Sequence, residues 1–145
     1  MFFDAENQLS SAQAFTGALT VTTNSYQKQS AAQDLSIGRR LSVLVVPTVS
    51  AGAGSTVKID AIQADDAALT TNVTILSTAS YLAAAAIAGA FLEVQYPQRT
   101  MTQLYLGAQV TITGGTTTMT ADIYLVPSDE IPAYRSFPKV VDAAV

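Results

Sequence analysis

The chain has 145 residues, enough for one domain that buries a core without crosslinks. It contains neither Cys nor His, which excludes disulfides, thiolate or imidazole metal sites and catalytic triads that need those side chains. Only 12% of the residues are charged, with seven basic against eleven acidic ones, and Arg39-Arg40 is the one adjacent cationic pair. We therefore expect no binding to nucleic acid, which draws on clustered cations.

Short runs of alternating apolar and polar residues follow one another along the chain, bounded by Gly, Pro, Asn and Ser. This period of two predicts β-strands. The expected strands cover residues 19–23, 40–49, 56–64, 72–78, 91–96, 103–113 and 118–126. Gly114-Gly115 predicts a hairpin turn between the last two.

Three segments have features beyond this alternation. The strand 40–49 is apolar on both faces, so we expect it to be covered on both sides. In strand 56–64 the alternation places Ile59 inward and Asp60 outward, where Asp60 would be a solubilising residue. The alanine-rich residues 80–90 fit either a short helix or a buried crossing loop.

Seven or eight short strands in one domain predict an all-β sandwich or barrel, because each sheet must bury its apolar face. The pattern by itself does not separate a jelly roll from an immunoglobulin-like sandwich. We expect the sandwich to span residues 18–126.

Both ends of the chain differ from this middle. Residues 1–17 show no strand period and are expected to form an N-terminal arm. Residues 127–145 carry three prolines and are expected to form a C-terminal arm, which either wraps over its own sandwich or packs on a neighbour. Aromatic and arginine side chains are enriched where proteins meet. The candidate partner contacts are Phe2, Phe3, Arg39, Arg40, Tyr134, Arg135 and Phe137.

No motif for catalysis, metal or cofactor binding stands out. Asp65-Asp66 would point to opposite faces of an extended chain, so a solvated turn is the favoured interpretation. Residues 52–58 lack the Gly-Lys-Ser/Thr order of a phosphate loop and predict a hairpin turn. The longest apolar run, 81–92, is too short to cross a bilayer. We expect a protein that is not an enzyme and has no cofactor, metal or membrane anchor.

Five short motifs resemble, in order and spacing, the jelly-roll capsid cement proteins of short-tailed bacteriophages. They are residues 9–15 (Leu-Ser-Ser-Ala-Gln-Ala-Phe), 34–39 (Asp-Leu-Ser-Ile-Gly-Arg), 57–66 (Val-Lys-Ile-Asp-Ala-Ile-Gln-Ala-Asp-Asp), 104–106 (Leu-Tyr-Leu) and 121–125 (Ala-Asp-Ile-Tyr-Leu). The similarity spans residues 9–126. The sequence departs from the family at Arg39-Arg40, where the family has Arg-Gly, and in its longer proline-rich tail.

The resemblance implies a jelly-roll-like antiparallel β-sandwich of about eight strands with extended N- and C-terminal arms. It implies a structural protein on the outer surface of the virion capsid, bound to the major capsid protein. It also implies a homo-oligomer, with a dimer favoured and a trimer as the other possibility. The alternative is a carbohydrate- or receptor-binding β-sandwich of a tail or fibre. That alternative needs exposed aromatic residues, and the chain has no Trp and six Tyr.

Overall fold

A computed structural model describes residues 8–33, 35, 40–97 and 100–131. Nine antiparallel strands make up nearly all of its regular structure, with one short 3₁₀ turn at Ser128–Glu130. The strands are β1 (Gln8–Phe15), β2 (Thr20–Val21), β3 (Tyr26–Gln27), β4 (Leu41–Val49), β5 (Thr56–Ala64), β6 (Thr74–Leu82), β7 (Leu92–Gln95), β8 (Tyr105–Thr113) and β9 (Met119–Pro127).

The strand pairs are nested inside one another. β1 pairs with β9, β2 and β3 with β8, β4 with β7, and β5 with β6. The chain is thus one long hairpin that turns back between β5 and β6. Two further pairs, β4 with β9 and β5 with β8, roll this hairpin into two sheets.

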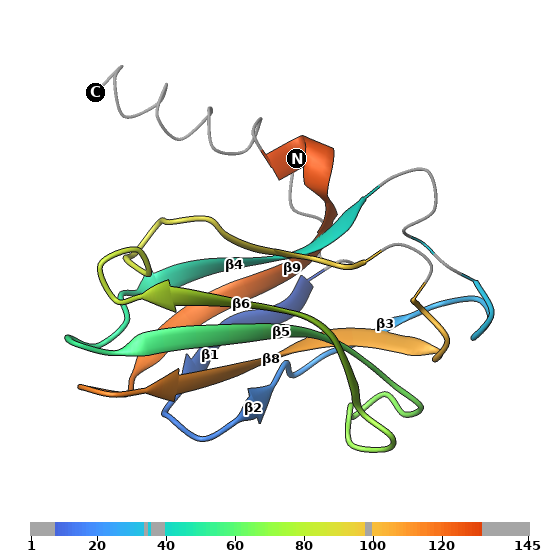
Figure 1. The fold of residues 1–145 in the computed structure, drawn as a ribbon, viewed down its shortest axis with the longest axis horizontal. Coiled ribbons are helices and arrows are strands. Elements are labelled where there is room, and N and C mark those ends of the chain that lie inside the picture. Colours follow the sequence, from blue (N-terminus) through green and yellow to red (C-terminus); the bar gives the residue numbers. More distant parts are fainter. Residues whose placement is uncertain (1–7, 34, 36–39, 98–99, 132–145) are drawn as a thin grey trace.

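The resulting sheet orders are β1-β9-β4-β7 and β2-β8-β5-β6, with β3 also on β8. Figure 1 shows the second sheet in front, with β6 along its upper border. This nested order is that of a jelly roll. The predicted all-β, jelly-roll-like sandwich is therefore confirmed.

The core lies between the two sheets and is built from the inward positions of alternating strands. From β5 it receives Val57, Ile59 and Ala61, all fully buried, as the alternation predicts. Tyr96 is buried in this core, and its hydroxyl donates a 2.7 Å hydrogen bond to the carbonyl oxygen of Gly107. Burial raises the pKa of the Tyr96 hydroxyl, so this group stays a neutral donor.

Strand β4 is covered on both sides, as expected from its two apolar faces. Its outward residue Leu44 is fully buried beneath Val126 and Ile131. Ile131 follows the 3₁₀ turn, so the first residues after β9 fold back over their own sheet. Of the expected C-terminal arm, residues 128–131 lie on their own sandwich, and residues 132–145 lie outside the described part.

Two expectations about element type were wrong. Residues 8–15, assigned to an irregular N-terminal arm, form β1 at the edge of the first sheet. Ala12 there has a φ of 47°, and the register with β9 shifts on either side of Ser10, which breaks the period of two. The helix considered for residues 80–90 does not form, because β6 continues to Leu82 and turns follow.

The second alternative for that alanine-rich segment, a buried crossing loop, also does not hold. After β6 only Ala86 is fully buried, while Ala84, Ala85, Ile87 and Ala88 are exposed. The short strand β3 was not predicted, because two residues carry no periodicity.

Candidate functional site

One end of the sandwich is built entirely from uncharged residues. We call this surface the uncharged end; it consists of residues 16–19, 49–55, 83–91 and 113–118. In Figure 1 three of its four loops form the tips at the left of the molecule. The fourth joins them through Gly17, whose carbonyl oxygen accepts a 3.2 Å hydrogen bond from Ile112 N, beside the start of the β8–β9 turn.

Backbone hydrogen bonds lock these loops to one another. They are Ala51 N to Ala86 O (2.8 Å), Gly52 N to Thr118 O (2.8 Å), Ala83 N to Ser55 O (3.0 Å) and Thr116 N to Ala53 O (3.0 Å). A Cβ on Gly52 would overlap the carbonyl oxygen of Thr116, so only glycine allows this approach. Gly114 and Gly115 both have positive φ, which confirms the predicted hairpin turn. The uncharged end is therefore a firm surface with fixed loops.

Aliphatic side chains project from this surface. Leu19 is 57% exposed, Val49 59% and Ile87 52%, and their surroundings are Gly, Ala, Ser and Thr. Soluble proteins normally place charges on such loops. An uncharged surface of this kind loses little hydration energy when another protein covers it.

The opposite end carries charge in the loop between β5 and β6. Asp66 accepts hydrogen bonds from Thr70 N, Thr70 Oγ1 and Thr71 N at 2.6–2.8 Å. Asp65 accepts from the side-chain amides of Asn72 (2.7 Å) and Gln103 (2.9 Å). These two carboxylates hold a turn and face separate partners, which agrees with the predicted solvated turn.

The hydrogen bonds lower the pKa of both carboxyl groups. For Asp66 the main cause is the Thr70 hydroxyl, followed by the backbone N–H of Thr71. For Asp65 it is the amide of Asn72, followed by that of Gln103. Both donors favour the charged form. Neither carboxyl is therefore poised to act as a general acid or base near neutral pH.

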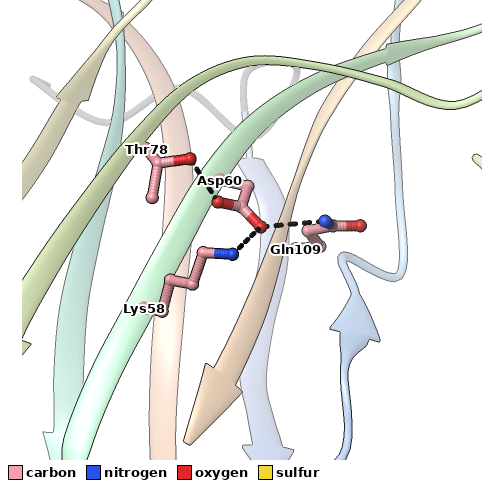
Figure 2. A network of polar contacts seen from close by, with 4 residues as sticks. All are labelled: Lys58, Asp60, Thr78 and Gln109. Atoms are coloured by element: carbon pink, nitrogen blue, oxygen red, sulfur yellow. Dashed lines mark hydrogen bonds and ion pairs between the residues drawn. The ribbon is translucent and has the colours of Figure 1, made fainter.

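Asp60 is more deeply buried than the strand pattern predicts. It points to the outer face of the second sheet, as expected, yet it is only 1% exposed. Thr78 Oγ1 donates to its Oδ1 at 2.6 Å, and Gln109 Nε2 donates to its Oδ2 at 2.8 Å. Lys58 Nζ lies 3.7 Å from the same Oδ2 (Figure 2).

The Asp60 network joins three neighbouring strands, because Thr78 lies on β6, Gln109 on β8 and Asp60 between them on β5. Both oxygens of its carboxylate are occupied by partners from its own sheet. The network thus fixes register and leaves no open position for a ligand.

Of the seven candidate contact residues, only Arg40 lies in the described part of the chain. Arg40 is exposed just before β4, and its carbonyl oxygen accepts a 2.9 Å hydrogen bond from Ser128 N. It lines a hollow of about 480 Å³ together with Ser77, Gln95, Tyr96 and Pro97. The remaining candidates lie outside the described residues: Phe2, Phe3, Arg39, Tyr134, Arg135 and Phe137.

The described residues contain neither a metal-binding cluster nor a membrane-spanning helix. There, no three or more Asp, Glu, His or Cys side chains gather in a way that could hold a metal ion. The same part of the chain contains no helix of the length and apolarity needed to span a bilayer.

Comparisons with known proteins add little to this picture. No protein-family model matches the chain, and no curated protein matches it. Among solved structures, one titled "Crystal structure of PirA" is similar over 79% of this chain and 90% of its own length, at 12% identity and a TM-score of 0.43. At that level the likeness carries no argument about function.

Proposed function

We propose that this protein is a capsid cement, or decoration, protein. It binds the outer surface of a bacteriophage head as a homo-oligomer and stabilises contacts between major capsid protein subunits. The observation that carries the proposal is the uncharged end, a rigid, loop-built surface with exposed Leu19, Val49 and Ile87 and no charged residue. Such a surface fits a protein partner that covers it permanently.

The physical demands on a cement protein agree with this surface. A shell offers many equivalent sites, so modest contacts repeated through an oligomer give a high overall affinity. Glycine- and alanine-rich loops can approach another backbone closely, and little side-chain entropy is lost when they become buried. The motifs that resemble jelly-roll cement proteins of short-tailed phages add independent support from the sequence.

The alternative, a carbohydrate- or receptor-binding module of a tail or fibre, has less support. Sugar binding by stacking needs aromatic rings that face solvent. Every aromatic side chain in the described part of the chain is at least partly buried; these are Phe15, Tyr26, Tyr81, Phe91, Tyr96, Tyr105 and Tyr124. Binding of the pure protein to a glycan array, without binding to heads, would favour this alternative.

The proposal predicts a major capsid protein encoded in the same genome as this chain, and empty heads assembled from that protein provide the test. We expect the wild-type protein to co-sediment with these heads. The double substitution Val49→Lys with Ile87→Lys places two charges on the uncharged end and should weaken binding at least about 10-fold, because each buried unpaired charge is costly. Ala68→Lys, in the exposed loop between β5 and β6, is the matched control and should bind normally.

Two results would overturn the proposal. One is wild-type protein that fails to bind the heads at saturating concentration. The other is equal binding by the double variant and the control, with circular dichroism showing that all variants are folded. Removal of residues 132–145 tests the arm separately: weaker binding by this truncation would assign a shell contact to Tyr134, Arg135 and Phe137. The cut leaves Ile131 in place over Leu44.

A further inference from the structure

The second sheet ends in an edge strand that lacks the usual protection against pairing. β6 lies at the border of its sheet, and in the described part of the chain it pairs with β5 alone. It has nine residues, Thr-Ile-Leu-Ser-Thr-Ala-Ser-Tyr-Leu, without a charge or a proline. Exposed edges of this kind are templates for another strand, and proteins normally blunt them.

The other sheet edges are blunted. β1 is bulged at two places along its register with β9. β2 and β3 have two residues each. β7 has four residues, carries Glu93 and is soon followed by Pro97, and the Tyr81 hydroxyl bonds both backbone groups of Glu93. Of the described edges, β6 is therefore the one suited to strand addition.

The register shows which backbone groups of β6 point outward. Ala83 N donates to Ser55 O, so the pair Thr56–Leu82 is a non-hydrogen-bonded pair. The two kinds of pair alternate along the regular register from Leu82 back to Ser77. The N–H and C=O groups of Thr78 and Ser80 therefore point away from β5. Both residues are exposed. The bulge at Leu76 lies outside this regular segment.

Apolar surface gathers around the same strand. Val73 is 38% exposed, Ile75 49% and Leu82 68%. The inward residues Ala79 and Tyr81 are only partly buried, whereas Leu9 and Phe15 on β1 are 2% and 1% exposed. The sandwich is thus less closed along β6 than along β1, and added chain there would complete the cover of the core.

The distribution of charge favours a second copy of this chain as the partner of the β6 edge. The chain carries a net charge of −4, so two copies repel each other over most of their surfaces. β6 is an uncharged strip about 30 Å long, given its nine residues. Antiparallel pairing of a strand with its own copy also satisfies the two-fold symmetry of a closed dimer.

We propose that β6 pairs antiparallel with β6 of a second copy, joining the two second sheets into one continuous sheet. The two-fold axis passes at Ala79. Thr78 of each copy then faces Ser80 of the other in a hydrogen-bonded pair, which makes four backbone hydrogen bonds across the axis. This inference deepens the homo-oligomer part of the proposed function by naming its interface, and it predicts a dimer, not a trimer.

The first test is Ser80→Pro, measured by sedimentation equilibrium. Proline removes the outward N–H of residue 80, which β5 does not use, so the sandwich should stay folded. We expect wild type to sediment as a dimer of 15.1 kDa chains and Ser80→Pro as a monomer, with the dimer Kd raised at least about 100-fold. Ser80→Ala keeps the N–H and should remain dimeric. A monomeric or trimeric wild type overturns the proposal, and so does a folded Ser80→Pro dimer.

A single cysteine provides a test that does not depend on how Ser80→Pro folds. The chain has no Cys. In the proposed pairing the two copies of residue 79 form a non-hydrogen-bonded pair with Cα atoms about 4.5 Å apart, within reach of a disulfide. Ala79→Cys should crosslink into a dimer on mild oxidation. Thr74→Cys, on the same strand but outside the regular segment, should not. Equal crosslinking of both variants contradicts the proposed register.

These outcomes are separable from those of head binding. If the wild-type protein is a dimer that does not bind heads, the proposed β6 interface stands and the proposed capsid function is overturned. If the wild-type protein is a monomer that binds heads, the capsid function stands and the β6 interface is overturned.

Discussion

Gln109 Nε2 donates a 2.8 Å hydrogen bond to Asp60 Oδ2 in the middle of the second sheet, where both side chains are almost fully buried. The bond connects β8 to β5, and Thr78 connects β6 to the other oxygen of the same carboxylate. One aspartate therefore holds three strands in register. A shift of one residue in either partner strand would leave a buried polar group without its bond.

We expect Asp60→Ala to lower the free energy of unfolding by about 3 kcal/mol, because it leaves the buried amide of Gln109 without its acceptor and also removes the bond from Thr78. Urea denaturation at neutral pH measures this loss. Asp60→Asn keeps an acceptor oxygen and should cost less than Asp60→Ala. Equal stability of wild type and Asp60→Ala would show that water replaces the carboxylate without cost.

Tyr81→Phe should remove a bridge between the two sheets. The Tyr81 hydroxyl donates to Glu93 O at 2.6 Å and accepts from Glu93 N at 3.1 Å. Loss of both bonds should cost about 1–2 kcal/mol in thermal or urea unfolding. Tyr105→Phe, a partly buried tyrosine on β8, is the control for removing a hydroxyl and should change stability less.

The turn that contains Asp65 and Asp66 should make stability depend on pH. Both carboxyls have a pKa below the ordinary value of 3.8 in the folded protein. Their contribution is therefore fully present above about pH 4 and is lost as the pH falls through the folded-state pKa values. The double variant Asp65→Asn with Asp66→Asn should show a flatter acid limb in its pH–stability curve.

A separate measurement assigns this effect to its cause. Thr70→Val removes the hydroxyl that is the largest cause of the lowered pKa of Asp66. NMR titration of the Asp66 carboxyl should then give a pKa closer to the ordinary value, with the Asp65 titration little changed. An unchanged Asp66 titration would contradict the role given to Thr70.

Gly52→Ala should damage the uncharged end. The new Cβ would overlap Thr116, and relief of that overlap should cost about 3 kcal/mol of stability. Gly89→Ala is the matched control in the neighbouring loop: its φ of +83° is strained for alanine, but nothing lies within 4 Å. The control should lose only about 1 kcal/mol. Similar losses in both variants would show that the contact between Gly52 and Thr116 can relax.

Periodicity predicted most of the sandwich because its long central strands alternate cleanly. Residues 56–64 were expected as a strand and form β5 with the same bounds, and the prediction for 103–113 contains β8. β1 was missed because Ser10, Ser11 and Ala12 are small or polar and a bulge interrupts their alternation. The alanines after residue 80 favour helix locally, yet β6 stays paired with β5 as far as Leu82.

The surface features were harder to read from the sequence. A period of two says which face Asp60 occupies but not how deeply its neighbours cover it. The uncharged end unites four segments that are far apart in the chain, and only the nested pairing brings them together. A signal was present all the same: residues 43–57 and 67–92 contain no charged side chain.

The outermost pair of the nested hairpin has a consequence for synthesis of the chain. β1 is the first described strand to leave the ribosome, and its partner β9 is the last. Gln8 pairs with Tyr124, so the first sheet stays incomplete until β9 has been translated. The first sheet therefore closes late, at the slow pace of distant contacts, and until β9 is in place the buried face of β4 is open to chaperones and to other nascent copies.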